Sequence, residues 1–382
     1  MDLHERIGRR QSAHNGGQLV VDQAYLSPAV HSSEPVGRGS VLERCLDVLE
    51  PVFDGELPPP FAVVGPAGSG TSAVVTALFA ELNDTFGDSD RVIGTSTRME
   101  RTGPTTWFLY IDGRRVKTPF AFYREALSTI TDEAVPESGI GTDELRERFV
   151  AKLERPNHRA VVAIDHHNEP ETLEYERVLE LLEPVSDHVG TAVVGTREPD
   201  EWHGSTITAP AYRQHELVDI VADRASTGLA AGALDHDSIR DIADWADGSA
   251  HDALTTLYVA AVLANDDDAT QIRNEHLETA MADVPTDGIH IDRTLTLSEN
   301  RQQVLLDLLS VSAESEPIRE VARKIESESS VTASTVTRFL YELADRGVLE
   351  RVGLPSTGSG RRPSTVEPRF SPIAFRSLVA VR

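Results

Sequence analysis

The sequence predicts an α/β core with a parallel sheet, an all-helical second domain and a C-terminal winged helix-turn-helix. Before residue 205, short runs that are apolar at consecutive positions alternate with helical stretches. Such runs suit strands that are covered on both faces of a parallel sheet. Between Tyr212 and Asp283 the apolar spacing is helical only, and after residue 295 the charge balance changes.

Length and pattern together set the expected domains. A chain of 382 residues exceeds what one compact core usually holds. We expect four segments, listed in order: a flexible N-terminal arm over 1–30, the α/β core over 31–205, the helical domain over 206–292 and the winged helix over 293–382.

The elements of the core follow from local patterns. An amphipathic helix is expected at residues 41–53, and a strand at 61–65 leads through a glycine loop into another helix. The remaining expected elements are strands at 107–113, 159–165 and 191–195 and a helix at 119–131.

Composition constrains the setting more than the fold. The formal net charge is -26, and the basic residues are 33 arginines and 3 lysines. An acidic surface with little lysine is typical of a halophilic archaeon; a GC-rich genome that favours arginine codons is the alternative. One cysteine and the lack of a long apolar run predict a reducing, cytoplasmic setting and no membrane partner.

The glycine loop carries the clearest chemical motif. Its residues are Gly65, Pro66, Ala67, Gly68, Ser69, Gly70, Thr71 and Ser72. Between a strand and a helix, this spacing lets backbone N–H groups surround a phosphate at a helix N-terminus. Thr71 stands where such loops carry lysine, so binding of ATP or ADP with Mg²⁺ is expected to be weakened or lost. A chance Gly/Ser turn is the alternative.

A second motif ends the strand at 159–165. Asp165 stands where a Walker B aspartate would hold Mg²⁺ together with Ser72, but His166 occupies the position of the glutamate that activates water. His166 and His167 can equally be ordinary polar residues at a strand end.

The segment order resembles the archaeal origin-recognition initiators, AAA+ ATPases related to eukaryotic origin-recognition and cell-division-control proteins. The resemblance covers about residues 22–382 and includes EPVGRGSVLERCLDVLEPVFDGELPPPFAVVGPAGSGTS, YIDGRRVKTPFAFYREAL and PAYRQHELVDIVADRA. It implies a P-loop core, a helical lid over 206–292 and nucleotide-site roles for Arg38, Tyr212 and the lid position His251.

The same resemblance reveals departures. His251 replaces the sensor arginine of the lid, and Thr196 with Arg197 replaces the sensor asparagine. With Thr71 and His166, these changes predict weak or absent ATPase activity. The implied partners are duplex DNA at an origin-like site, other initiator subunits and the replicative helicase.

The C-terminal segment is expected to bind DNA. Residues 296–382 hold 12 basic and 11 acidic residues, against 24 and 51 in residues 1–295. Helices are expected at 298–312 and 317–328, with a third from residue 332 that runs into a strand; RFSPIAF is expected to be extended.

In this segment, Thr332 or Ser334 is expected to cap the third helix. The expected DNA contacts are Thr332, Ser334, Thr335 and Arg338 at base edges, and Arg361 and Arg362 at phosphates or in the minor groove. A winged helix that docks a protein is the alternative.

We therefore hypothesise an initiator-like protein that recognises duplex DNA, with weak or lost ATPase activity. Two alternatives stay open: an ATP-hydrolysing switch that loads a helicase, and a transcription regulator or interaction module on the same architecture.

Overall fold

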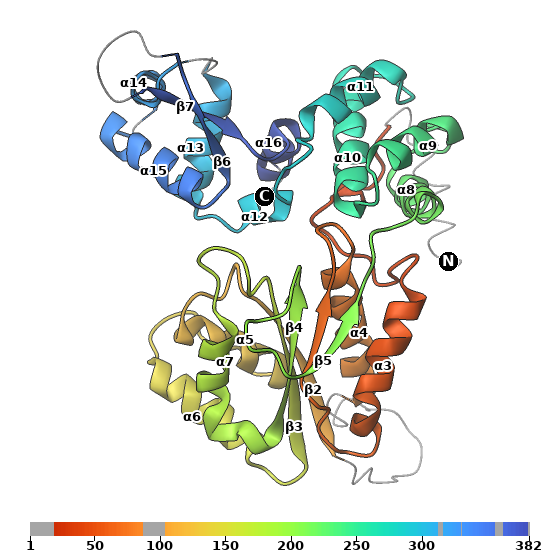
Figure 1. Ribbon diagram of the computed structural model, residues 1–382, viewed down its shortest axis with the longest axis vertical. Helices are drawn as coiled ribbons and strands as arrows, with labels where there is room; N and C mark the ends of the chain where they lie inside the picture. The colour runs from red at the N-terminus through yellow and green to blue at the C-terminus, as the bar shows by residue number, and fades with distance from the viewer. Residues whose placement is uncertain (1–18, 87–103, 312–315, 330, 356–361, 381–382) are drawn as a thin grey trace. The chain divides into compact units, whose positions relative to one another are not determined.

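The structure is a computed structural model that describes residues 19–86, 104–311, 316–329, 331–355 and 362–380. By its contacts the chain divides into two compact units (Figure 1). One is residues 31–212; the other contains residues 213–382 together with the described residues before His31. Arg361 and most of the predicted arm lie outside the described residues.

The first unit contains the predicted parallel sheet. Its strands are β1 (Phe61–Val64), β2 (Thr105–Asp112), β3 (His158–Asp165), β4 (Val189–Gly195) and β5 (Ser205–Thr208). They lie in the order β2-β3-β4-β1-β5, with each neighbouring pair parallel. Four of them match expected strands, whereas the short edge strand β5 was not expected.

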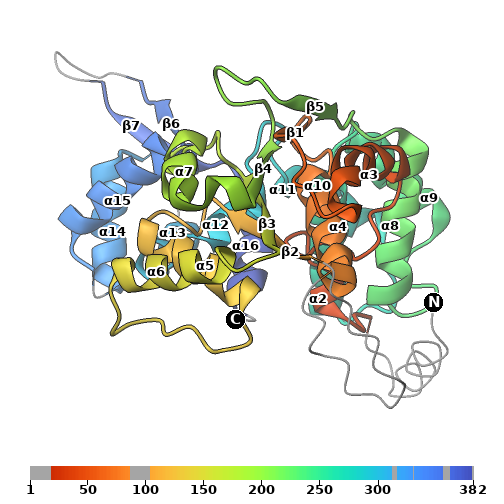
Figure 2. The same cartoon turned by 90° about the horizontal axis from the view of Figure 1, so that it is seen from below.

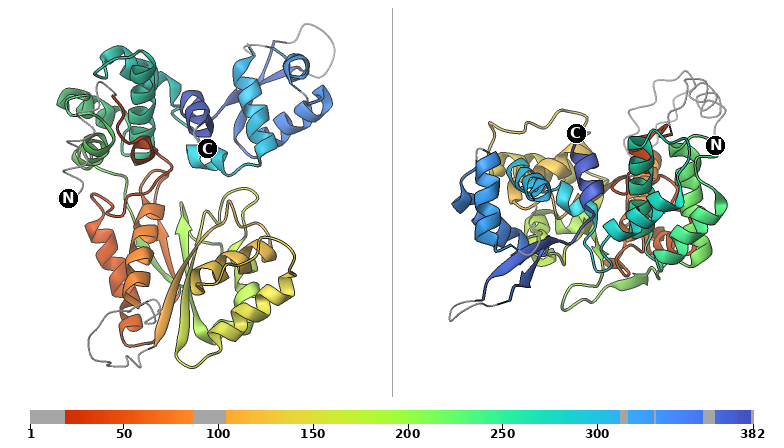
Figure 3. Two further views of the ribbon diagram at one scale, coloured as in Figure 1. Left: turned by 180° about the vertical axis from the view of Figure 1, so that it is seen from behind. Right: turned by 90° about the horizontal axis from the view of Figure 1, so that it is seen from above.

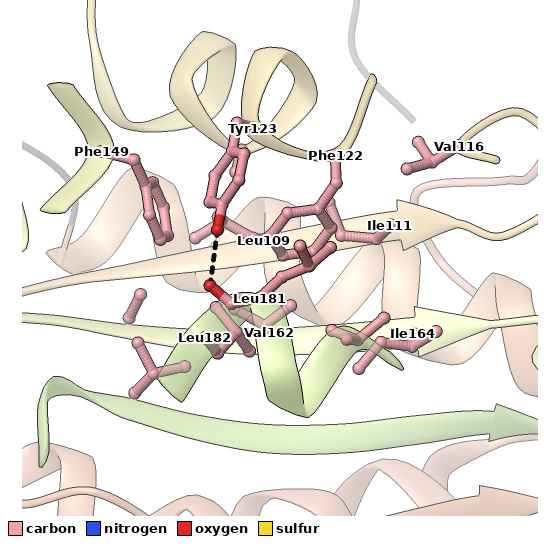
Figure 4. Packing of buried hydrophobic residues seen from close by; sticks show 14 of the residues in the cluster. Leu109, Ile111, Val116, Phe122, Tyr123, Phe149, Val162, Ile164, Leu181 and Leu182 are labelled. Atoms are coloured by element: carbon pink, nitrogen blue, oxygen red, sulfur yellow. Dashed lines mark hydrogen bonds between the residues drawn. The ribbon is translucent and has the colours of Figure 1, made fainter. Parts of the chain in front are cut away.

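Helices cover both faces of this sheet (Figures 2 and 3). They are α3 (Gly39–Phe53), α4 (Thr71–Phe86), α5 (Pro119–Ile130), α6 (Thr142–Leu153), α7 (Tyr175–Leu182) and the 3₁₀ helix η2 (Glu183–His188). Buried residues of α3 and α4 form one core with the sheet, and those of α5, α6 and α7 form another. In the second core the Tyr123 hydroxyl donates to the carbonyl of Leu181 at 2.7 Å (Figure 4).

The helix starts follow from local chemistry. The Thr118 side chain accepts the N–H of Ala121 at 3.2 Å, and Pro119 is the first residue of α5. A hydroxyl at the N-cap followed by proline is a favoured helix start, because proline lacks the N–H that would have no partner there. The predicted helix at 119–131 is therefore confirmed within a residue.

The second unit begins with the predicted all-helical region. Its helices are α8 (Gln214–Gly228), α9 (His236–Trp245), α10 (Ala250–Asp266) and α11 (Asn274–Asp283), followed by the short α12 (Ile291–Leu295). The helical spacing predicted between Tyr212 and Asp283 is therefore confirmed. The parallel-sheet core with a helical domain after it is thus the architecture that the sequence predicts.

The prediction of a flexible arm up to residue 30 is wrong for its described part. The helix α2 (Gln23–Leu26) contacts α8, and Val20 forms a β-bridge with Leu229. Leu26 is 1% exposed, and Gly228 leaves room for it, because a Cβ there would lie 2.4 Å from Leu26. Burial of a few apolar side chains fixes this segment although its composition is polar.

The remaining elements lie near the C-terminus. They are α13 (Glu299–Ser310), α14 (Ile318–Glu328), α15 (Ala333–Asp345), the antiparallel strands β6 (Leu349–Gly353) and β7 (Ser364–Pro368), and α16 (Pro372–Ala380). The three helices and the strand after them occur where the sequence predicts. Figure 3 shows β6 and β7 extending away from the helices.

The expectation that RFSPIAF is extended is wrong. The strand ends at Pro368, and helix α16 begins at Pro372. Ser371 precedes it, and its hydroxyl accepts the N–H of Ala374 at 3.1 Å. Serine at the N-cap followed by proline is a helix-start signal that the alternating apolar pattern concealed.

Candidate functional site

The glycine loop joins β1 to α4 and has the backbone of an anion cradle. Gly68 and Gly70 both have φ of +75°, in the left-handed region that favours glycine. At Gly65 a Cβ would lie 2.2 Å from the carbonyl oxygen of Ala209, so only glycine fits. The loop therefore has the curvature that points N–H groups toward the start of α4.

Arg38 and Tyr212 support this loop. The Arg38 guanidinium donates to the carbonyl oxygens of Ser69 at 2.8 Å and Pro210 at 2.7 Å, and it stacks 3.4 Å from the centre of the Tyr212 ring. Both residues are buried, and a Cβ on Gly70 would meet the Tyr212 hydroxyl at 2.4 Å. These contacts hold the loop in shape; direct nucleotide contact by either residue stays a prediction.

The loop fits a phosphate group but lacks the lysine that such loops usually carry. The hydroxyl of Ser69 is buried and has no hydrogen-bond partner among the described residues. A buried donor without a partner is costly, and a phosphate oxygen would satisfy it. Thr71, the first residue of α4, is 9% exposed and brings no charge.

At the end of β3, Asp165 lies in a dense polar cluster. Its side chain is fully buried; Oδ1 accepts the backbone N–H of His166 at 2.7 Å, and Oδ2 accepts the Tyr110 hydroxyl at 2.5 Å. Burial alone would raise the pKa of Asp165, but His166, the Ser72 and Tyr110 hydroxyls and Arg114 together hold it below its ordinary value. The carboxylate is therefore ionised at neutral pH. The structure thus brings the predicted pair Asp165 and Ser72 together.

Next to this carboxylate is an ion-pair group. Arg114 binds Glu169 through two of its guanidinium nitrogens, with Nε donating to Oε2 at 2.8 Å and Nη2 to Oε1 at 2.5 Å. The His166 Nδ1 lies 3.5 Å from Oδ1 of Asp165 and 3.5 Å from Oε1 of Glu169. His166 also has φ of 58°, a strained conformation for a non-glycine residue. The His166 side chain therefore packs against Asp165 and Glu169. It occupies the position at which a glutamate would be needed to orient water.

Thr196 and Arg197, which stand at the expected sensor position of this unit, have local partners. The Thr196 hydroxyl accepts the Asn168 side-chain amide at 2.5 Å, and Arg197 lies 3.2 Å from Asp200. His167 lies 3.0 Å from the Arg197 carbonyl, and burial lowers the pKa of His167.

The side chain of His251, on α10, makes its contacts with other residues of the second unit. Its Nε2 accepts the N–H of Ile291 at 2.9 Å, and its ring stacks on His290 with centroids 4.1 Å apart. The side chain is 10% exposed, and Nδ1 lies 3.1 Å from Asp252. These contacts join the lid to α12. The predicted nucleotide role of His251 stays a prediction.

Sequence reasoning missed Tyr110 and Glu169. Tyr110 is two residues before Asp112, which pairs in register with Asp165 on the neighbouring strand. The carboxyl ends of parallel strands meet at one edge, so the polar end of the strand at 107–113 was the available signal.

The candidate DNA face lies at the start of α15. Thr332, Ser334 and Thr335 group their hydroxyls, with Thr332 Oγ1 at 3.2 Å from Ser334 and 3.1 Å from Thr335. Thr332 is the N-cap residue of α15, as predicted, but its side chain makes no capping hydrogen bond; Glu326 on α14 accepts the Ala333 N–H at 2.9 Å instead. The exposed Arg338 lies over the Phe339 ring at 5.0 Å.

The side chain of Arg362 is held by hydrogen bonds within the protein. Its guanidinium donates to the carbonyl oxygens of Leu354 at 2.8 Å and Gly353 at 3.3 Å, which closes the β6–β7 hairpin. Its expected phosphate contact therefore competes with hydrogen bonds inside the protein. Arg361 lies outside the described residues.

Comparison with known proteins gives the family. The model of an AAA ATPase domain matches residues 34–194, and the model of the Cdc6 AAA+ ATPase-type lid domain matches residues 218–282. Among the described residues, no helix is both long and apolar enough to cross a membrane.

Whole-chain relatives point the same way. The chain is 24% identical over 360 residues to the ORC1-type DNA replication protein 1 of Sulfurisphaera tokodaii, covering 87% of this chain and 86% of the relative. It is 25% identical over 343 residues to the protein of the same name from Aeropyrum pernix, covering 82% of each.

The solved structure of the Aeropyrum pernix ORC1 protein in complex with DNA is similar in fold. Its TM-score is 0.63 at 21% identity, covering 95% of this chain and 97% of that one. With the AAA domain, the lid and the relatives in agreement, the chain belongs to the Cdc6/ORC1-type AAA+ ATPase family.

Proposed function

We propose that this protein recognises duplex DNA at an origin-like site, through a winged helix formed by α13, α14, α15 and the β6–β7 hairpin. In this arrangement α15 is the recognition helix, because it is the last of the three helices and leads directly into the hairpin. The N-terminal end of α15 would enter the major groove.

The observation that carries this proposal is the free face at the start of α15. Glu326 accepts the Ala333 N–H, so the hydroxyls of Thr332, Ser334 and Thr335 bond to one another and not to the helix backbone. Hydroxyls and an exposed arginine at this position can contact base edges, since arginine pairs with guanine and Ser/Thr accept or donate.

Two further findings support a DNA partner. The relatives are named as DNA replication proteins, and the fold is similar to that of an ORC1 protein solved with DNA. The near-neutral balance after residue 295 also contrasts with the acidic remainder of the chain. A basic or neutral surface approaches phosphates at a lower electrostatic cost than an acidic one.

In the proposed function the glycine loop binds nucleotide weakly and the protein does not hydrolyse ATP. The cradle is intact, but Thr71 supplies no charge, and His166 packs against Asp165 and Glu169. Hydrolysis needs charge stabilisation and an oriented water in the transition state. An ATP-hydrolysing helicase-loading switch is therefore the less supported alternative.

The test compares one arginine of the candidate face with a surface arginine of the other unit. Arg338→Ala is expected to cost about 1–3 kcal/mol on a preferred duplex while leaving binding to a scrambled duplex nearly unchanged. Arg177→Ala is the matched control, because Arg177 is exposed on α7 and pairs with Glu180. Fluorescence anisotropy of labelled duplexes measures both.

The result can also exclude the proposal. Equal losses on both duplexes would show that Arg338 does not read bases. Wild-type affinity that does not distinguish any sequence would favour a protein-docking role for this domain.

A further inference from the structure

In the polar cluster at Asp165, both oxygens of the buried carboxylate already accept hydrogen bonds from this chain. Oδ1 accepts the His166 N–H at 2.7 Å, with the His166 imidazole at 3.5 Å, and Oδ2 accepts the Tyr110 hydroxyl at 2.5 Å. The Asp165 side chain is 0% exposed. Both oxygens of the Walker B carboxylate therefore already have donors from this chain.

The Tyr110 hydroxyl is placed there by the sheet. Tyr110 lies on β2, on the same face as Phe108, and β2 pairs with β3 in parallel register. That face packs against α4, which begins at the glycine loop. Burial, and then the charge of Asp165, raise the pKa of Tyr110, so the phenol stays protonated and remains a donor.

Mg²⁺ fits this arrangement poorly. It requires near-octahedral oxygen ligands at about 2.0–2.1 Å, and a carboxylate ligand must offer it a lone pair. Ser72 is beside Asp165, but its hydroxyl already stabilises the carboxylate, as does that of Tyr110. Coordination through Oδ2 would therefore compete with the charge-assisted hydrogen bond from Tyr110.

The two neighbouring arginines are held by groups of the protein. Arg114 is bound by Glu169 through two hydrogen bonds, and Arg38 donates to two backbone carbonyls under the loop. The phosphate must then be held by backbone N–H groups, the Ser69 hydroxyl and the positive end of α4. Without a metal ion or a lysine, these groups suit a diphosphate better than a triphosphate, because a diphosphate carries fewer negative charges.

We propose that the glycine loop binds a nucleoside diphosphate without a divalent cation, and that the Tyr110 hydroxyl is the group that excludes Mg²⁺ from Asp165. This inference rests on the nucleotide-binding part of the proposed function and is independent of DNA recognition. Loss of the Arg338 effect on DNA would leave it intact, and its own failure would leave DNA recognition intact.

The experiment titrates the full chain with ADP by calorimetry, in high-salt buffer with either EDTA or MgCl₂. Wild type is expected to bind ADP in EDTA at least as tightly as in MgCl₂, because Mg²⁺ withdraws free ADP from solution. Tyr110→Phe is expected to bind ADP about 10-fold or more tightly in MgCl₂ than in EDTA, since an oxygen of Asp165 becomes available. Tyr175→Phe is the matched control, because its buried hydroxyl bonds to Thr191 at 3.0 Å and not to Asp165.

Three outcomes would overturn the inference: a 10-fold gain of wild-type affinity in MgCl₂, no ADP binding in EDTA, or a folded Tyr110→Phe variant that behaves as wild type does. Circular dichroism establishes that the variants fold. If Tyr110→Phe does not fold, equilibrium dialysis of the unmodified chain with Mn²⁺ and ADP decides. Fewer than about 0.1 Mn²⁺ per bound ADP is expected, and one Mn²⁺ per ADP would refute the proposal.

Discussion

Asp283 ties the last helix of the lid to the C-terminal helix, and its replacement tests how firmly they are joined. The carboxylate of Asp283, at the end of α11, accepts the Ser371 hydroxyl and the Ile373 N–H, the latter at 3.2 Å. Ser371 is 3% exposed and caps α16. We predict that Asp283→Ala loosens α16 locally.

The magnitude follows from what the substitution leaves unpaired. A buried polar group that loses its partner costs about 1–3 kcal/mol, and here one hydroxyl and one N–H at a helix start lose theirs. Because Asp283 is only half-buried, we expect a total of about 2–4 kcal/mol. This equals a fall of about 30- to 1,000-fold in the protection of α16 amides.

Native-state hydrogen exchange with peptide mass spectrometry measures this change. Asp283→Asn keeps an acceptor and should lose less than about 1 kcal/mol. Asp237→Ala is the matched control, because Asp237 is 89% exposed in the first turn of α9. Unchanged protection of α16 in Asp283→Ala would refute the reasoning.

The same site has a defined pH dependence. Burial raises the pKa of Asp283 in the folded protein, despite the hydrogen bond from Ser371. A carboxyl group whose pKa is higher in the folded than in the unfolded protein stabilises the fold. This contribution is fully present below the pKa of the unfolded state and is lost as the pH rises through the pKa of the folded state. The loss caused by Asp283→Ala should therefore be larger near pH 4 than near pH 7.5.

Three other predictions test separate parts of the molecule. Thr71→Lys should tighten ADP binding by about 10- to 100-fold in calorimetry, yet phosphate release should stay at background; robust hydrolysis would contradict this. Arg362→Ala should lower stability by about 1 kcal/mol in denaturant titrations, through loss of its bonds to Leu354 and Gly353, and should change the salt slope of DNA binding by less than one. The lowered pKa of Asp165 should make the first unit lose stability as the pH falls below about 4, and thermal melts of Asp165→Asn should lack this step.

Much of the fold could be predicted because its patterns are local. The strand FAVV and the AVVAI stretch of the strand HRAVVAID are apolar at consecutive positions, and the helices of the lid have clear helical spacing. The strand STIT of β5 carries no such signal, since only Ile207 is buried among its four residues. Its place is set by pairing with β1, a contact that no local pattern encodes.

The candidate site was predictable only in part. The glycine loop and Asp165 are sequence motifs, so their proximity could be foreseen from strand and helix order. Tyr110 could not be assigned to Asp165, because their contact depends on β2 lying next to β3 in the sheet. Likewise, Glu326 caps α15 from a neighbouring helix, which a search for caps beside Thr332 overlooks.

The central claim, that this family member recognises a specific duplex sequence, is tested most directly by selection from a random duplex library with the full chain in high-salt buffer. The selected duplex and a scrambled version are then titrated at several KCl concentrations. We predict one enriched motif, bound about 1,000-fold or more tightly than the scrambled duplex. No enrichment, with equal affinities at every salt concentration, would contradict the claim.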